Sequence, residues 1–147
     1  MMTGSIFRWR TKEKEYKNHK KSNRSESCDF CQLVKQHTSQ VVEETQHCLI
    51  IKNRFGYDFW DGCGVDDHLM VIPKQHVDSL ANLSDEEKID YMNQIARFES
   101  SGYSIYARAQ GSKTKSMIHQ HTHLIKIDGK TKKWLIFLQK PHIVITR

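Results

Sequence analysis

The chain has 147 residues, of which 37% are hydrophobic and 27% charged, and its formal net charge is +6. This length and apolar content suffice for one globular domain with a core, and no apolar run reaches the roughly 18 residues that a membrane span needs. The first residues lack the apolar centre of a secretion signal, so we expect a cytoplasmic protein with no membrane partner.

The positive charge is concentrated near the N-terminus. Residues 1–27 contain eight lysines and arginines against three glutamates, whereas the rest of the chain is close to neutral. Because this segment is also poor in apolar residues, we expect a basic tail over residues 1–26 that is disordered or loosely helical, followed by one folded domain over residues 27–147. A solvated tail is the simpler interpretation, and contact with nucleic acid or another anionic surface is the alternative.

The folded part alternates short apolar runs with turn signals. Strands are predicted over residues 46–53, 68–73, 103–109, 118–127, 134–138 and 143–146, and a structured, glycine-rich loop over residues 54–64. One helix is predicted from Ser84, which forms a capping box with Glu87, to the stop at Gly102. Asp128-Gly129 is typical of a hairpin turn. These elements indicate an α+β fold, an antiparallel β-sheet with one main helix on one face.

Two of the four cysteines have metal-ligand spacing. Without a secretion signal, all four are expected to be reduced thiols. Cys28 and Cys31 are separated by two residues, which suits two thiolates on one metal ion. Two unrelated thiols or a redox pair are the alternatives, although the βαβ setting of a thioredoxin-type pair is not predicted. Further ligands would have to come from distant segments, either His68 or the histidines near residue 120. His68 is equally well explained as a hydrogen-bonded core residue.

Three histidines alternate in His119-Gln120-His121-Thr122-His123. In a β-strand they would project from one face, with neighbours about 7 Å apart. One metal ion cannot reach all three, because a metal–nitrogen bond is only about 2 Å long. Therefore either the three histidines have different functions, or together they bind a longer ligand such as a chain of phosphates. Neutral imidazole is a nucleophile near pH 7 and can form a phosphoramidate, and Ser116 is close enough in sequence to contact a phosphate oxygen.

Together these motifs resemble the histidine triad (HIT) family of nucleotide hydrolases and transferases, whose signature alternates histidine with apolar residues. The segment 68–74, followed by His76, resembles the family's upstream histidine-containing strand. The turn that begins at Asn53 resembles the asparagine turn that lies against the nucleoside. The Cys28/Cys31 pair resembles the zinc-containing branch. The resemblance covers about residues 26–127 and implies a HIT-like fold.

The resemblance implies a role for each matched residue. His121 would be the nucleophile that attacks the α-phosphorus, His123 the supporting histidine at the phosphates, and Ser116 a contact to a phosphate oxygen or the leaving group. Asn53 would complete the nucleotide-binding set. A structural Zn²⁺ would be held by four residues: Cys28, Cys31, His68 and His119.

We therefore expect a nucleotide hydrolase that cleaves a nucleoside phosphate at the α-phosphorus through a nucleotidyl-histidine intermediate. The alternatives are a nucleotidyltransferase or phosphorylase, an enzyme that removes adenylate from nucleic-acid ends, and a zinc-stabilised nucleotide-binding protein without turnover. The expected partner is the nucleotide substrate. The resemblance also implies a homodimer, and nucleic acid is a candidate partner of the basic tail.

Overall fold

The computed structural model describes residues 7–22, 28–36, 38–132, 134–137 and 142–145. Its helices are α1 (Arg10–Ser22), α2 (Asp29–Lys35), the short 3₁₀ helix η1 (Leu80–Asn82) and α3 (Asp85–Ser100). Its strands are β1 (Val41–Glu44), β2 (Cys48–Lys52), β3 (Phe59–Trp60), β4 (Cys63–Pro73), β5 (Ser104–Ala107), β6 (Thr122–Thr131), β7 (Trp134–Phe137) and β8 (His142–Ile145).

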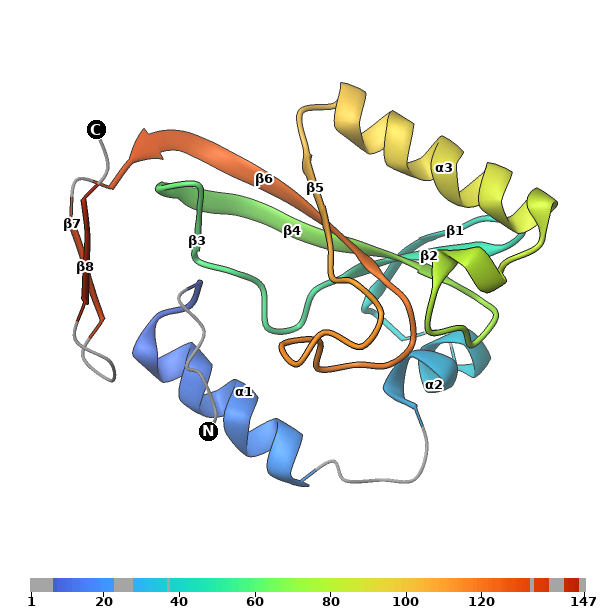
Figure 1. Ribbon diagram of the computed structural model, residues 1–147, viewed down its shortest axis with the longest axis horizontal. Coiled ribbons are helices and arrows are strands. Elements are labelled where there is room, and N and C mark those ends of the chain that lie inside the picture. Colours follow the sequence, from blue (N-terminus) through green and yellow to red (C-terminus); the bar gives the residue numbers. More distant parts are fainter. Residues whose placement is uncertain (1–6, 23–27, 37, 133, 138–141, 146–147) are drawn as a thin grey trace.

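An antiparallel sheet forms the centre of the molecule (Figure 1). Its strand order is β1-β2-β4-β6-β5, with β3 paired to β4, and β7 pairs with β8 in a separate antiparallel two-stranded sheet. The long strands β4 and β6 lie side by side, with Met70 opposite His123 and Leu69 opposite Leu124. The α+β fold class expected from the sequence is confirmed, and this central pair positions the histidines.

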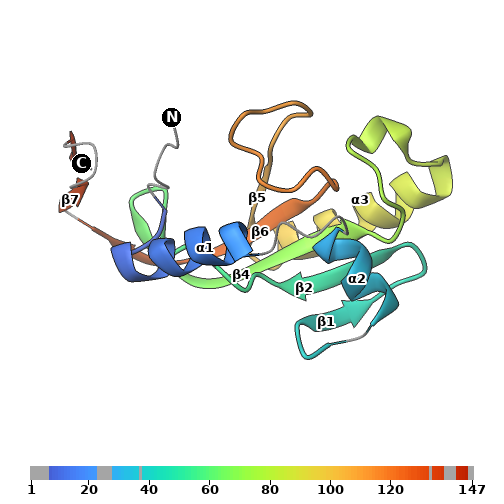
Figure 2. The same cartoon turned by 90° about the horizontal axis from the view of Figure 1, so that it is seen from below.

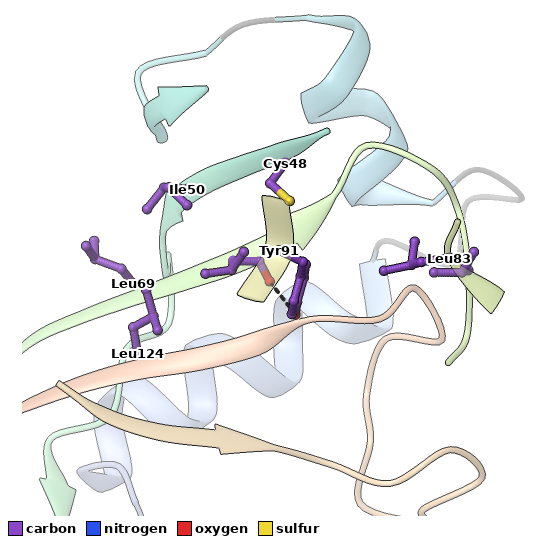
Figure 3. Close-up of a cluster of buried hydrophobic side chains, with 8 residues drawn as sticks. Cys48, Ile50, Leu69, Leu83, Tyr91 and Leu124 are labelled. Atoms are coloured by element: carbon purple, nitrogen blue, oxygen red, sulfur yellow. Dashed lines mark hydrogen bonds between the residues drawn. The ribbon is translucent and has the colours of Figure 1, made fainter. Parts of the chain in front are cut away.

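The two faces of the sheet bury different residues, because side chains alternate along each strand. On one face, Leu69 and Leu124 pack with Tyr91 of α3 (Figure 3). The Tyr91 hydroxyl also donates a 2.8 Å hydrogen bond to the Thr122 hydroxyl. On the other face, Met70 packs with Phe30 of α2. Figure 2, seen from below, shows α1 and α2 on this second face and α3 behind the sheet. His123 is opposite Met70, so it belongs to the face of α2.

Helix α3 begins as predicted. The Ser84 hydroxyl accepts from the Glu87 amide, and the Glu87 carboxylate accepts from the Ser84 amide, so both halves of the capping box are present. The helix ends at Ser100, and Gly102 follows with a φ of +87°. This left-handed conformation favours glycine and stops the helix where the sequence indicates.

Several elements differ from the sequence prediction. Asp128-Gly129 is not a hairpin turn: β6 continues to Thr131, and the two residues form a bulge between the pairs Val65–Ile127 and Cys63–Thr131. Gly129 has a φ of +67°, the conformation that made the dipeptide look like a turn. Strand β4 begins at Cys63, five residues before its expected start, and α2 and β1 were not predicted. Leu138 and Thr146, at the ends of two predicted strands, lie outside the described residues.

Over the described residues 7–22 the basic segment is helical, one of the two states expected for it, and it packs against the domain. Residues 10–22 form α1, and Phe7 stacks on Tyr57 with ring centroids 4.7 Å apart. Glu13 is buried. The few apolar residues of the segment are enough because they pack against an aromatic loop of the domain instead of forming a core of their own. The rest of the predicted tail, residues 1–6 and 23–26, lies outside the described residues. No helix within the described ranges is long and apolar enough to cross a membrane.

Candidate functional site

Two cysteines and two histidines from three distant segments form a candidate metal centre. Their ligand atoms all lie within 4.8 Å of one another. Cys28 and Cys31 flank the first turn of α2, and His119 precedes β6. The Sγ atoms of Cys28 and Cys31 lie 3.5 and 3.6 Å from His119 Nδ1, and Cys31 Sγ lies 3.1 Å from His76 Nδ1. The group therefore connects α2, the turn after β4 and the segment before β6.

These four side chains fit a tetrahedral zinc ion. With Zn–S and Zn–N bonds of about 2.3 and 2.0 Å, tetrahedral angles place sulfur and nitrogen about 3.5 Å apart, close to the separations found here. His119 Nε2 donates a 2.9 Å hydrogen bond to the Pro73 carbonyl. That bond leaves Nδ1, the nitrogen facing both thiols, with the lone pair that a metal ligand needs.

The expected ligand His68 is not part of this group, and His76 is in its place. The physical reason is distance along β4. His68 lies five residues before Pro73, which corresponds to about 16 Å of extended strand. Pro73 is the residue whose carbonyl contacts His119, so the metal group is at the end of β4. His76 follows in the next turn and reaches it. Its position after the proline was the available sequence signal.

His121 lies between the metal group and the remaining histidines. Its Nδ1 donates a 2.9 Å hydrogen bond to the backbone carbonyl of His119, which leaves Nε2 unprotonated. The Phe30 ring packs edge-on against both His119 and His121, with centroids 5.7 and 5.3 Å away. Burial lowers the pKa of His121 below its ordinary value, and the cations Lys115 and Arg108 lower it further. His121 is therefore a neutral imidazole with a fixed tautomer.

A chain of hydrogen bonds also fixes the tautomers of His68 and His123. The Tyr57 amide donates to His68 Nδ1 at 2.9 Å, so the proton of neutral His68 must be on Nε2. His68 Nε2 is 2.9 Å from His123 Nδ1 and donates to it, which leaves the proton of His123 on its own Nε2. Burial lowers the pKa of His68 to about 3 and that of His123 well below its usual value. His123 thus presents an N–H donor beside His121, their ring centroids 5.0 Å apart.

The histidines do not form one continuous strand face. Strand β6 begins at Thr122, so His119 and His121 precede it. The Gln120 amide donates to the Val77 carbonyl at 2.6 Å, and this contact holds the segment outside the sheet ladder. The three histidines have different partners: His119 faces the cysteines, while His121 and His123 face each other.

The two remaining candidates have different surroundings. Asn53 lies beside His68, with its Nδ2 3.1 Å from His68 Nε2 and its Oδ1 accepting from the Phe55 amide at 3.0 Å. The Oδ1 bond holds the turn, whereas Nδ2 makes no hydrogen bond to His68 in the tautomer assigned above, because both nitrogens are donors. Ser116 is exposed in the loop between β5 and β6, three residues before His119.

Aromatic rings and cations that sequence reasoning missed surround the histidines. Tyr57 and Tyr106 both stack on His123, with centroids 5.5 and 5.8 Å away. The Arg108 guanidinium donates to both tyrosine hydroxyls, at 3.5 and 3.3 Å. Lys115 Nζ contacts Gln120 Oε1 at 2.6 Å. In the sequence, these residues are isolated tyrosines and cations in separate segments, so no motif marks them.

The pKa of His68 leads to a prediction about stability. The pKa of His68 in the folded state, about 3, is below the ordinary value of 6.5. Between these two pH values the unfolded state therefore binds more protons than the folded state. The contribution of neutral His68 to the stability of the folded state is lost as the pH falls from 6.5 towards 3. The wild-type free energy of unfolding should therefore decrease over this range. In His68→Gln, which has no titrating ring, the slope should be smaller by up to about 1.4 kcal/mol per pH unit. Denaturant titrations at pH 7, 6, 5 and 4 measure it, and equal slopes would contradict this assignment.

Comparisons with known structures support the class of fold that this geometry suggests. A HIT family hydrolase from Clostridium thermocellum is 21% identical, with a TM-score of 0.53 over 74% of this chain and 97% of that chain. A histidine triad nucleotide-binding protein from Candida albicans is 22% identical, with a TM-score of 0.55 over 71% and 78%. A member of the HIT family from Bacillus subtilis is 23% identical, with a TM-score of 0.56 over 71% and 76%. The fold is therefore HIT-like.

The sequence itself shows which family the chain belongs to. Residues 15–140 match the family described as proteins similar to the CwfJ C-terminal region, and the chain belongs to that family. The match begins inside α1, so the family includes part of the segment that the sequence suggested was a tail. No curated protein sequence matches the chain significantly.

Proposed function

We propose that this protein is a nucleotide hydrolase that cleaves a nucleoside phosphate at its α-phosphorus through a nucleotidyl-histidine intermediate. The observation that carries the proposal is the state of His121. Its Nδ1–H is bonded to the His119 carbonyl, and burial keeps the ring neutral, so Nε2 has a lone pair in a fixed direction. An oriented, neutral imidazole is what attack on phosphorus requires.

In the first step, the His121 Nε2 lone pair forms a bond to the α-phosphorus. The bond from phosphorus to the leaving oxygen breaks, and its electron pair departs with that oxygen. His123 contributes a hydrogen bond from Nε2–H to an oxygen near the phosphorus. It does not give up its proton, because its partner His68 is also neutral and could not replace it without becoming an anion. Arg108 and Lys115 supply the positive field that offsets the developing negative charge.

In the second step, water attacks the nucleotidyl-histidine and restores the ring. The proton released by the water goes to the leaving-group oxyanion or to solvent. A different acceptor in place of water would give transfer instead of hydrolysis, with His121 in the same role. The four residues Cys28, Cys31, His76 and His119 would hold a structural zinc ion, which when bound ties α2 to the segment that carries His121.

Direct detection of the intermediate tests the proposal. The purified protein is mixed with nucleoside phosphoramidates, dinucleoside polyphosphates, nucleotide sugars and adenylated DNA in turn, then denatured in alkali and measured by intact-protein mass spectrometry. We expect a mass increase of one nucleotidyl group, located at His121 by peptide mapping. Turnover without a covalent adduct would overturn the mechanism. Nucleotide binding without turnover on any substrate would favour a nucleotide-binding protein.

A second candidate, action on nucleic-acid ends, is favoured by the surface of α1. This helix has six lysines and arginines against two glutamates. Arg10, Lys14, Lys17 and Lys21 recur at intervals of three and four residues, which places them along one face, where they line a shallow pocket. A row of cations beside a nucleotide site would hold the phosphates of a single strand whose end enters the site.

The salt dependence of binding tests this second candidate. Each neutralised phosphate of a single strand changes the slope of log K against log salt by about 0.7. The triple variant Arg10→Gln, Lys14→Gln, Lys21→Gln should therefore reduce the slope for a labelled single-stranded oligonucleotide by about 2, measured by fluorescence anisotropy. A control variant removes three exposed lysines elsewhere: Lys52, Lys88 and Lys130. Equal slopes in the two variants would count against nucleic acid as the partner of α1.

A further inference from the structure

The N-terminal segment, residues 7–12, contacts almost every residue of the loop 55–59, and this loop orients His68. The Arg8 guanidinium donates from Nε to the Phe55 carbonyl at 2.6 Å. Lys12 Nζ donates to the Gly56 carbonyl at 3.2 Å. The carbonyl of Phe7 accepts from two successive amides, Asp58 at 2.7 Å and Phe59 at 3.1 Å. These bonds connect residues 7–12 to residues 55–59, about 45 positions later in the chain.

Charge and aromatic contacts reinforce the same interface. Lys12 Nζ pairs with the Asp58 carboxylate at 2.6 Å, and the same carboxylate accepts from the Trp9 amide at 2.8 Å. The Arg8 guanidinium lies 4.5 Å from the Tyr16 ring centre and 5.0 Å from that of Tyr57. Only 9% of its side chain is exposed. A charge this deeply covered requires a fixed arrangement of partners, so Arg8 is held in one place.

The loop held in this way carries the first donor of the histidine chain. The Tyr57 amide fixes the tautomer of His68, and through it that of His123. Gly56 lies directly against His68, since a β-carbon placed on this glycine would be 3.3 Å from the His68 Cβ. A shift of a few tenths of an ångström in residues 55–57 would therefore change the bond at His68. The domain supplies the histidines, and the N-terminal segment supplies the restraint on the loop that orients them.

We propose that residues 7–12 are an integral part of the catalytic site, in which Arg8 and Lys12 act as positioning residues that hold the 55–59 loop and so keep His68 and His123 in the tautomers that turnover requires. This inference rests on the proposed function for its effect on turnover, but its effect on the histidine tautomers can be measured without any substrate.

The experiment compares three variants of the full chain. Arg8→Gln/Glu13→Gln removes the buried guanidinium together with its carboxylate partner, so that neither charge is left unpaired. Lys12→Ala removes the two contacts to Gly56 and Asp58. The control is Lys20→Ala, an exposed lysine of α1 that is not one of the four cations of the row described above. The ring-nitrogen chemical shifts of ¹⁵N-histidine report the tautomer of each imidazole, and steady-state kinetics report kcat and KM separately.

We expect the wild type and Lys20→Ala to show His68 and His123 protonated only on Nε2. Arg8→Gln/Glu13→Gln and Lys12→Ala should show mixed tautomers at both residues. Their kcat should fall to about one tenth of the wild-type value or below, with KM changed much less than kcat. Wild-type tautomers and kcat in a folded Arg8 or Lys12 variant would overturn the inference. If the Arg8 variant does not fold, Lys12→Ala alone decides the question. Altered tautomers in a protein that has no turnover on any substrate would contradict the proposed function and leave the positioning role intact.

Discussion

Replacing His121 with asparagine should lower turnover by roughly 10³-fold or more while nucleotide binding persists. Asparagine keeps a polar group of similar reach, and its amide can still bond to the His119 carbonyl, but it has no nitrogen lone pair that can attack phosphorus. The expected loss is therefore in kcat. Steady-state kinetics with the best substrate of the panel, together with isothermal titration of a non-hydrolysable nucleotide, separate the two quantities.

A matched control distinguishes chemistry from structural damage. His47 lies in the turn between β1 and β2, and its hydrogen bonds to the Asp90 carboxylate and the Lys74 amide use its backbone amide and carbonyl, not its ring. His47→Asn should keep near wild-type turnover. His123→Asn should be impaired most with substrates that have poor leaving groups, because its N–H assists the departing oxygen. Wild-type turnover in His121→Asn, with contaminating hydrolases excluded, would end the covalent mechanism.

The second large effect concerns the metal. The purified protein should contain about one zinc ion per chain, and either Cys31→Ser or His76→Asn should reduce this well below one and lower the melting temperature by on the order of 10 °C. Two thiolates and two imidazoles leave no open coordination position, so the expected loss is of stability more than of the chemistry of molecules that remain folded. Elemental analysis by mass spectrometry and thermal unfolding measure the two quantities.

His68→Asn is the variant that separates the two possible ligand sets. Because His68 bonds to Tyr57 and His123 and not to the cysteines, this variant should retain its zinc while losing the tautomer chain. Zinc loss in His68→Asn, combined with full zinc content in His76→Asn, would restore the ligand set that the sequence resemblance implies. Full stability in a protein stripped of metal by a chelator would contradict a structural role.

The candidate metal group and His121, the proposed nucleophile, are connected through His119. His119 contributes its ring to the metal group and its carbonyl to His121, and Phe30, between the two cysteines in sequence, packs on both rings. Zinc at this place would therefore hold the groups that orient His121. The proposed metal would lie close to the proposed nucleophile, because the residues that would bind the metal also support His121.

Local patterns in the sequence determined the elements whose signals are short in range. The capping box at Ser84 and Glu87 specified the start of α3, since a helix terminus is decided by bonds within four residues. The apolar run after His68 specified the buried part of β4. The alternating histidines indicated that one metal ion cannot bind all three, because metal–ligand bonds are shorter than the spacing of side chains along a strand.

Only the tertiary structure decided which distant groups meet. His76 joined the metal group because β4 carries His68 too far from Pro73. Asp128-Gly129 became a bulge because β4 continues alongside it, and pairing with a neighbouring strand outweighs a local preference for a turn. The N-terminal segment folded because its few aromatic residues and Arg8 found partners about 50 residues away. A contact over such a separation depends on where the whole chain brings its parts, and no pattern within a short stretch of sequence contains that information.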